Sequence, residues 1–299
     1  MPNRANKYFC VTIDVEPDCS VSWQRSDPLT FINIETGIKD ILHPLFSNHG
    51  VKPTYLISPE VLNHPQSVEI FNKLKDCELG AHLHSEYIGP DLEYENPAGT
   101  RSKEFPNNLP YESERLKIRA ITKLFTHCFG YSPKSYRAAK FGADEDTFKM
   151  LIEFGYNIDT SVTPKINWHE KGGPDFAGFP DQPYWIEQGR LLEIPVTIAG
   201  KRMPFLPSRW FCYRWLRPSM MSCYEMKRLI DRFTTKNPNG VVLNMMFHSM
   251  EIIPNASPYV RTEKGQRNFL KKLKTVFEYL KKSGFESRTL IEIYNDKLR

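Results

Sequence analysis

Short apolar runs alternate with amphipathic stretches along almost the whole chain, and this alternation constrains the fold more than any other feature. Apolar runs that predict buried strands occur at 8–16, 51–57, 76–82, 135–138, 156–160, 191–198, 241–247 and 287–291. Helical periodicity occurs at 34–48, 111–128, 144–154, 223–235 and 263–283. Strands that alternate with helices predict an α/β fold with a mostly parallel sheet and right-handed crossovers. Seven or eight such units favour a barrel-like closure, and no repeat or Gly/Ser-rich linker divides residues 1–299, so we expect a single domain.

The composition argues against several classes of protein. The net charge is only +5, and the Lys and Arg residues are spread along the chain, so we expect no nucleic-acid partner. The six cysteines form no CxxC pair, which argues against a disulfide framework or a zinc–cysteine site and fits a reducing compartment. The sequence has no apolar signal region and no run of about eighteen apolar residues, so we expect a cytoplasmic protein without a transmembrane segment.

Two stretches interrupt the alternation of strands and helices. Segment 89–110 is polar and rich in Pro and Asn, which is typical of a functional loop. Segment 204–221 is dense in aromatic residues and arginine, and it fits a covering loop, a sugar-stacking wall or a patch that contacts a membrane surface. At a barrel mouth, Trp210 would stack on a sugar, while Arg209, Arg214 and Arg217 would bind the diphosphate of a nucleotide- or lipid-linked substrate.

The first predicted strand ends in two acids, Asp14 and Glu16. Side chains two residues apart on a strand point the same way, so both carboxylates would face one pocket. Open α/β folds bind their ligands at this end of the strands. We therefore expect one carboxylate to hold a cation and the other to remain free as a base.

The third predicted strand ends in a cluster of metal donors, His82, His84 and Glu86. His82 shares a face with His84 if the strand continues, and with Glu86 if a helix begins. Either pair, together with a carboxylate from the first strand, makes a three-ligand site with open positions, which is the pattern of a hydrolytic metal. Imidazole and carboxylate donors suit Zn²⁺ or a similar first-row cation.

Two more strands deliver charged groups to the same edge of the sheet. Arg137 ends the strand at 135–138, and an Arg beside a carboxylate fixes its orientation and lowers its pKa. His248 follows the apolar strand at 241–247, at the end where a barrel carries its catalytic groups.

In this order the motifs resemble those of the polysaccharide deacetylase (NodB-homology, carbohydrate esterase) superfamily, over almost the whole chain. The likeness is carried by the stretches 137–146, 155–164 and 247–251. It implies a distorted (β/α)7-type barrel that holds one divalent metal ion by an acid and two histidines. The roles it assigns are Asp14 as catalytic base, Arg137 as its partner, His248 as general acid and His82 as first metal histidine, with Phe141 and Asp159 as substrate contacts.

The sequence departs from the family pattern at two points. Val15 fills the place of the second of two adjacent Asp residues, so Glu16 is the nearest acid, and the second histidine is His84 because position 86 is Glu. The third ligand is thus either His84 or Glu86. The resemblance implies a metal-dependent hydrolase that removes an N-acyl group, acetyl in the first instance, from an amino sugar in surface-polysaccharide or glycan biosynthesis. The alternatives are a carbohydrate-binding pseudoenzyme and a hydrolase of a non-sugar linear amide such as a ureide.

Overall fold

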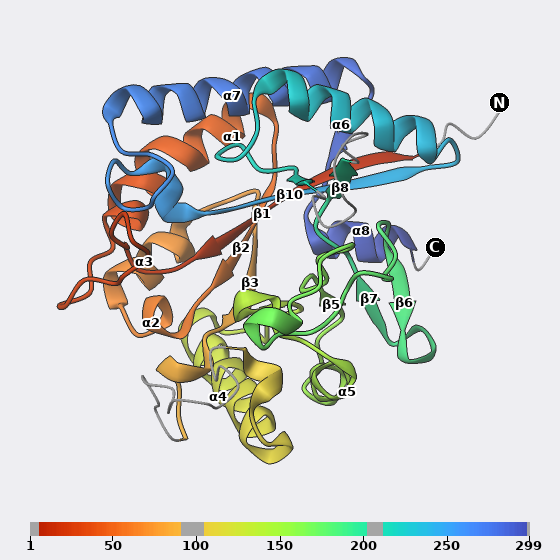
Figure 1. Cartoon of the computed structure of the whole chain (residues 1–299). Helices are drawn as coiled ribbons and strands as arrows, with labels where there is room; N and C mark the ends of the chain where they lie inside the picture. Colours follow the sequence, from red (N-terminus) through yellow and green to blue (C-terminus); the bar gives the residue numbers. More distant parts are fainter. Residues whose placement is uncertain (1–5, 91–104, 202–211, 298–299) are drawn as a thin grey trace.

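The centre of the molecule is a curled sheet whose strands are, with one exception, parallel (Figure 1). The computed structural model describes residues 6–90, 105–201 and 212–297. The nine-stranded sheet has the order β10-β1-β2-β3-β4-β5-β7-β6, and β11 pairs with β1 beside this path. Its strands are β1 (Lys7–Val15), β2 (Pro53–Ile57), β3 (Glu78–Leu83), β4 (Ser135–Ala138), β5 (Ile158–Asp159), β6 (Tyr184–Ile186), β7 (Leu191–Glu193), β10 (Val241–His248) and β11 (Glu286–Ser287). Along the path only β6 runs antiparallel, so the predicted α/β fold with a mostly parallel, barrel-like sheet is confirmed, and the sheet forms a half-barrel.

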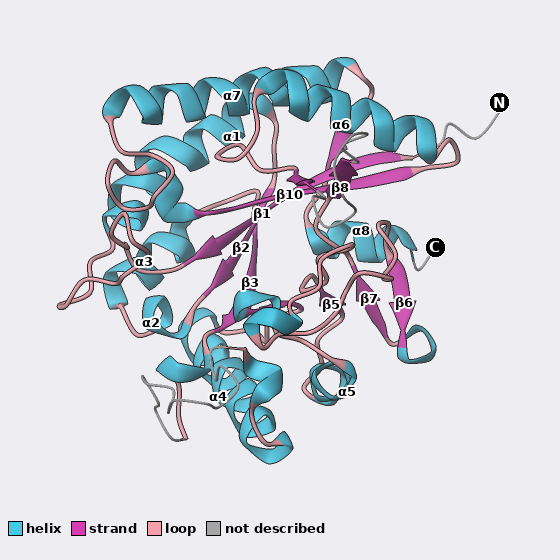
Figure 2. Ribbon diagram, viewed as in Figure 1, coloured by secondary structure: helices cyan, strands magenta, loops and turns pink. Residues whose placement is uncertain are grey.

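Helices cover the outside of the curled sheet (Figure 2). The predicted helix at 34–48 begins as a π-helix, Asn33–Leu42, and continues as the α-helix α1 (His43–His49). The other helices are α2 (Pro59–Leu62), α3 (Pro65–Lys73), α4 (Tyr111–Phe129), α5 (Glu145–Glu153), α6 (Cys223–Lys236), α7 (Glu263–Lys282) and α8 (Leu290–Lys297). None of the helices among the described residues is both long and apolar enough to cross a membrane.

Strand periodicity separates an apolar outer face from a polar inner face. On β1 the alternate residues Phe9, Val11 and Ile13 belong to the main core under the helices, and Phe9 stacks on Phe277 of α7. The residues of the other alternation, including Thr12 and Asp14, are buried on the opposite face. Because β3, β4 and β10 follow the same alternation, their polar residues also point into the barrel.

The strand predicted at 191–198 is shorter than expected. Strand β7 ends at Glu193, and Pro195 supplies no N–H for a ladder in the next residues. The chain then forms β8 (Ile198–Lys201), which pairs with the unpredicted β9 (Cys212–Trp215) in a separate antiparallel sheet. β9 lies within the segment 204–221, of which residues 204–211 fall outside the described residues.

Individual hydrogen bonds, and not a strand ladder, join the residues that follow β7 to β10. The Thr197 N–H donates to the Asn244 carbonyl at 3.1 Å, and the Asn244 N–H donates to Thr197 Oγ1 at 2.8 Å. Asn244 Nδ2 also donates to the Ile194 carbonyl at 3.2 Å. The barrel therefore has a seam between β7 and β10 that is closed largely by side chains.

The strand predicted at 287–291 is present, but it is shorter and begins one residue earlier than expected. β11 covers only Glu286–Ser287, and α8 begins at Leu290. Thr289 caps this helix together with Glu292, because the Glu292 N–H donates to Thr289 Oγ1 at 3.3 Å and the Thr289 N–H donates to Glu292 Oε2 at 3.0 Å. This capping box is a sequence signal that the apolar residues Leu290 and Ile291 outweighed in the prediction.

A buried carboxyl group between α4 and α5 makes stability depend on pH. Glu114 is only 2% exposed, and burial raises its pKa to about 8 although Thr147 Oγ1 donates to it at 2.6 Å. Between the ordinary glutamate pKa of 4.5 and a pH of about 8, the folded chain keeps a proton that the unfolded chain has lost, so stability falls as pH rises. The slope is at most about 1.4 kcal/mol per pH unit. We expect Glu114→Gln to flatten this slope in urea unfolding measured between pH 5 and 8.

The matched control for that measurement is Glu112→Gln, an exposed acid on the same helix. It should leave the slope as in the wild type. An unchanged slope in Glu114→Gln would show that Glu114 is ionised in the folded protein.

Candidate active site

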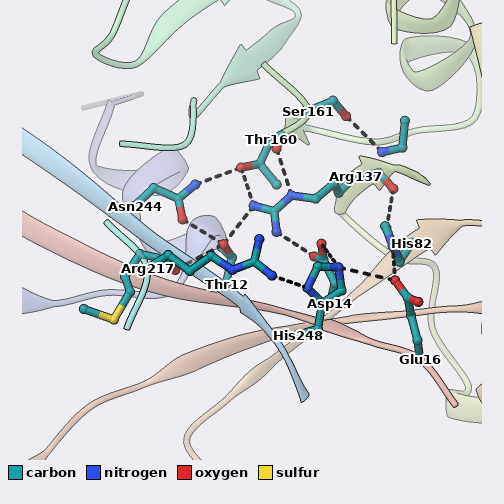
Figure 3. A network of polar contacts seen from close by, with 12 residues as sticks. Thr12, Asp14, Glu16, His82, Arg137, Thr160, Ser161, Arg217, Asn244 and His248 are labelled. Carbon is teal, nitrogen blue, oxygen red and sulfur yellow. Dashed lines mark hydrogen bonds and ion pairs between the residues drawn. The ribbon is translucent and has the colours of Figure 1, made fainter. Parts of the chain in front are cut away.

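Polar side chains from four strands converge inside the barrel near the carboxyl ends of the strands (Figure 3). Asp14 on β1 is in register with His248 on β10, and His82 on β3 is in register with Arg137 on β4. All four occupy inward positions of parallel strands, with β10 beside β1 and β3 beside β4, so the strand alternation directs them to the same side of the sheet. Glu16 follows β1 directly and joins them.

Glu16, His82 and His84 form a triangle of ligand atoms. Glu16 Oε1 lies 3.2 Å from His82 Nε2 and 3.2 Å from His84 Nε2, and the two nitrogens are 3.2 Å apart. All three residues are buried. An ion with tetrahedral bonds of about 2.0–2.1 Å has ligand atoms about 3.3 Å apart. The triangle therefore fits a small divalent cation such as Zn²⁺.

The second nitrogen of each imidazole has its own partner. His82 Nδ1 lies 3.0 Å from the Arg137 carbonyl oxygen, and His84 Nδ1 lies 3.2 Å from Glu86 Oε1. Such partners fix the ring so that Nε2 is presented to a metal. Of the two alternatives for the third ligand, the distances favour His84 and leave Glu86 as the residue that orients it.

The carboxylates of Glu16 and Glu86 favour positive charge in the triangle. Burial opposes ionisation of Glu16, yet His84 and His82 hold the pKa of Glu16 well below its usual range. Burial also opposes protonation of His84, but Glu16 and Glu86 raise the pKa of His84 to about 9. A site that stabilises an added positive charge so strongly on an imidazole also favours a bound cation.

Asp14 is held by the fully buried Arg137. Arg137 Nη1 donates to Asp14 Oδ1 at 2.6 Å, and Nη2 donates to Thr12 Oγ1 at 2.8 Å. Thr160 receives two further bonds from the same guanidinium, at its carbonyl and at Oγ1. Burial would raise the pKa of Asp14, but Arg137 and the imidazoles of His82 and His248 lower it overall. Asp14 is thus an ionised carboxylate in a fixed orientation.

His248 faces both carboxylates of the site. Its Nε2 lies 3.9 Å from Asp14 Oδ2 and 3.7 Å from Glu16 Oε1. On the other side of the ring, Nδ1 lies 3.0 Å from Glu251 Oε1, which also accepts the backbone N–H of His248 at 2.8 Å. This pairing directs Nε2 toward the site.

Glu251 was missed in the sequence reading, although the motif at 247–251 contains it. Its side chain is completely buried and binds Arg217, whose Nη2 also lies 3.0 Å from His248 Nδ1. Burial raises the pKa of Glu251, but the Arg217 charge and the contact with His248 outweigh burial and bring it to about 2. Glu251 therefore carries a negative charge behind His248 at all physiological pH values.

The predicted substrate contacts lie in different surroundings. Phe141 is close to the site, because its ring centroid is 5.7 Å from the Arg137 guanidinium, and it packs against Trp168 and Trp215. Asp159 is not at the site opening: it is completely buried, and its carboxylate accepts the N–H and the hydroxyl of Ser161. Trp210 lies outside the described residues.

The structure corrects the expected diphosphate contact. Arg217 is 7% exposed and is committed to Glu251, so it does not offer its guanidinium to a phosphate. Arg214 on β9 lies 3.5 Å from Glu225 Oε1, and Arg209 lies outside the described residues. The arginine-rich and aromatic composition of segment 204–221 could not predict this ion pair, because Glu251 is distant from Arg217 in the sequence.

Arg25 is a further residue that the sequence reading missed. Its Nη2 donates to Glu16 Oε2 at 3.1 Å, and it also forms an ion pair with the buried Glu60. The guanidinium lies 4.3 Å from the centroid of the Tyr87 ring. Glu16 therefore has one oxygen in the triangle and the other bound to Arg25.

The sequence matches no model of a protein family and no curated protein. Among solved structures, a protein of Mycobacterium smegmatis provisionally described as a polysaccharide deacetylase is similar, with a TM-score of 0.50 and 14% identity over 97% of this chain and 95% of that chain. A family GH57 branching enzyme from Thermococcus kodakaraensis, in complex with glucose, has a TM-score of 0.53 and 11% identity over 97% of this chain and 71% of that chain. A family 4 carbohydrate esterase from Streptomyces lividans, in complex with acetate, has a TM-score of 0.48 and 12% identity over 96% of this chain and 94% of that chain.

These similarities concern the fold and not the reaction. The branching enzyme and the deacetylase have different described activities, so the function must be argued from the site. The resemblance drawn from the sequence motifs and the structural match agree on the architecture. The chain has the fold of the polysaccharide deacetylases, a curled and mostly parallel half-barrel.

Proposed function

We propose that the protein is a metal-dependent amide hydrolase that removes an N-acyl group, most simply acetyl, from an amino sugar. One observation carries the proposal: an ionised carboxylate, a triangle of metal donors and a histidine with a buried acid behind it all meet at one end of the barrel. Amide hydrolysis needs a base for water, charge stabilisation at the carbonyl and an acid for the amine. Each of these tasks has a candidate residue here.

Asp14 is the proposed base. Arg137 occupies Oδ1 and leaves Oδ2 directed toward His248, so the free oxygen can accept a proton from a water between the two residues. A divalent cation bound by Glu16, His82 and His84 would supply Lewis acidity, which polarises an amide carbonyl and lowers the pKa of a water. Arg137 keeps the carboxylate ionised and prevents it from turning toward the cation.

His248 is the proposed general acid. An amine leaves an amide only when its nitrogen is protonated, and Nε2 of His248 is the ring nitrogen that faces the reacting region. Glu251 accepts the backbone N–H of His248, and its carboxylate lies 3.0 Å from Nδ1, so it holds the ring with Nε2 toward the site. The two residues thus divide the proton transfers: Asp14 accepts a proton from water, and His248 delivers one to the departing amine.

The proposed substrate is a small or polymeric N-acyl sugar, and a cytoplasmic location remains part of the proposal. The argument for a nucleotide- or lipid-linked substrate loses its support once Arg217 is committed to Glu251. The direct test is to load the protein with Zn²⁺, add an N-acetylglucosamine disaccharide and measure acetate release. We expect one acetate for each free amine that appears.

Metal binding can be tested separately from turnover. We expect one Zn²⁺ per chain. We expect His84→Ala to remove it, because only two protein ligands would remain and a catalytic zinc site needs three. Glu86→Gln should weaken binding by about 10–100-fold, the usual effect of losing a partner that orients a ligand. Competition with a chelating dye measures all three affinities.

His127→Ala is the control, because His127 is exposed on α4 and should leave the affinity unchanged. Stoichiometric metal in His84→Ala would contradict the triangle. Absence of bindable metal in the wild type would favour the non-catalytic carbohydrate-binding alternative. Bound metal with turnover of simple linear amides, but not of sugars, would favour the non-sugar amidase.

A further inference from the structure

A short hairpin at 19–25, here called the 19–25 hairpin, projects beside the candidate active site. Its arms are joined by an antiparallel bridge between Cys19 and Arg25 and by a hydrogen bond of 2.7 Å from the Ser20 N–H to the Gln24 carbonyl. Trp23 lies at the tip, where its N–H donates to the Ser20 carbonyl at 3.1 Å. The φ angle of Trp23 is +61°, in the left-handed region that a bulky residue rarely adopts. Strain of this kind is common where a side chain is held in place for binding.

The base of the 19–25 hairpin is fixed to the metal-binding triangle. Arg25 binds Glu16 Oε2 and Glu60, and its side chain is 13% exposed. The same guanidinium lies over Tyr87. The position of the hairpin is therefore set by the carboxylate that supplies one corner of the triangle.

The tip of the hairpin meets the proposed general acid. The Trp23 ring centroid is 5.3 Å from that of His248, with the rings tilted by 58°. Tyr259, from the loop after β10, meets Trp23 edge to face at 5.7 Å, and the Arg217 guanidinium lies 4.9 Å from the Tyr259 ring. Trp23 is 40% exposed and Tyr259 is 39% exposed, so both rings keep accessible surface. A partly exposed tryptophan thus adjoins the residue that would protonate the leaving group, and a partly exposed tyrosine packs against that tryptophan.

We propose that Trp23 and Tyr259 form the binding subsite for the sugar ring that carries the departing amine. The inference rests on the proposed function, in which His248 delivers a proton to the amide nitrogen. The atom bonded to that nitrogen is a carbon of the leaving sugar, so this ring must lie on the His248 side and the acyl group on the other. Aromatic faces suit the apolar C–H face of a pyranose, while the Tyr259 hydroxyl offers a polar handle at the same place. The subsite selects the amine part of the substrate and is indifferent to the acyl group.

The test compares two substrates with the same acetyl group and different amines. One is the N-acetylglucosamine disaccharide, and the other is N-acetylethanolamine, which has no ring. We expect Trp23→Ala to lower kcat/KM for the disaccharide about tenfold or more, mainly by raising KM, and to leave the ringless amide unchanged. Trp23→Phe keeps a flat apolar face and should recover most of the loss. Trp185→Ala is the matched control, because Trp185 on β6 is 37% exposed and packs edge to face on Tyr294 away from these residues.

Equal losses on both substrates would overturn the proposal, because Trp23 would then act through His248 and not through the sugar. Disaccharide constants in Trp23→Ala that equal those of Trp185→Ala would overturn it as well. Calorimetric binding of N-acetylglucosamine to the zinc-loaded protein separates this inference from the reaction. Binding that Trp23→Ala abolishes, without acetate release by the wild type, would keep the subsite and reject the hydrolase. Acetate release that Trp23→Ala does not alter would reject the subsite alone, and a wild type that neither binds nor hydrolyses the sugar would reject both.

Discussion

Asp14→Asn is expected to lower kcat by a factor of about 10² to 10⁴ while the metal content stays at the wild-type level. Asparagine keeps the shape of the side chain and one acceptor for Arg137, but it cannot take a proton from water. Glu16, His82 and His84 do not depend on Asp14 for their mutual geometry. The measurements are steady-state acetate release and zinc content after gel filtration.

The control is Asp159→Asn, which makes the same change at a buried acid on β5 away from the triangle. It should retain turnover, and it also tests the sequence-based prediction that Asp159 contacts substrate. Since Arg137 is completely buried, a thermal unfolding curve must accompany Asp14→Asn. Loss of zinc together with activity would assign Asp14 to the metal and not to the water.

His248→Ala should lower kcat by about 10² to 10⁴ with little change in zinc affinity. The reason is that the leaving amine loses its proton donor, while the three donors of the triangle remain. Added imidazole should restore part of the rate, because a small acid can occupy the space that the side chain left. Near-normal turnover without imidazole would show that water or another residue delivers the proton.

Glu251→Gln belongs to the same experiment. It should lower kcat less than His248→Ala does, because the imidazole remains but loses the carboxylate next to Nδ1. A loss of zinc in either variant would contradict the separation between acid and metal site.

The sequence predicted the fold well because the fold depends on local pattern. Strand alternation on β1 and β10 places Asp14 and His248 on the inner face without any knowledge of tertiary contacts. The same reasoning brings His82 and Arg137 to neighbouring positions on β3 and β4. These four side chains could therefore be assigned to one site from their positions at the ends of strands.

The remaining parts of the site depend on contacts that the sequence does not encode locally. Arg25 is in a polar loop, and only the folded chain brings it to Glu16 and Glu60. Arg217 was predicted to bind phosphate, but in the folded chain it forms an ion pair with Glu251, which lies 34 residues later in the sequence. The choice between His84 and Glu86 also depends on the folded backbone: His84 stays extended just after β3 and faces Glu16, while a 3₁₀ turn that begins at Ser85 places Glu86 next to His84 Nδ1.

At the seam beside β10, the amide side chain of Asn244 makes hydrogen bonds to three other segments of the chain. Asn244 accepts from Thr12 through Oδ1 and donates to Thr160 and to the Ile194 carbonyl through Nδ2, so one side chain links β10 to β1 and to the segments that follow β5 and β7. A ladder of backbone bonds survives almost any substitution, since every residue except proline carries the same groups. Closure of this barrel instead depends in part on the amide side chain at position 244, which most substitutions would remove. A single substitution at this position would therefore change the spacing of Thr12 and Thr160, and with it the position of Arg137, which binds both.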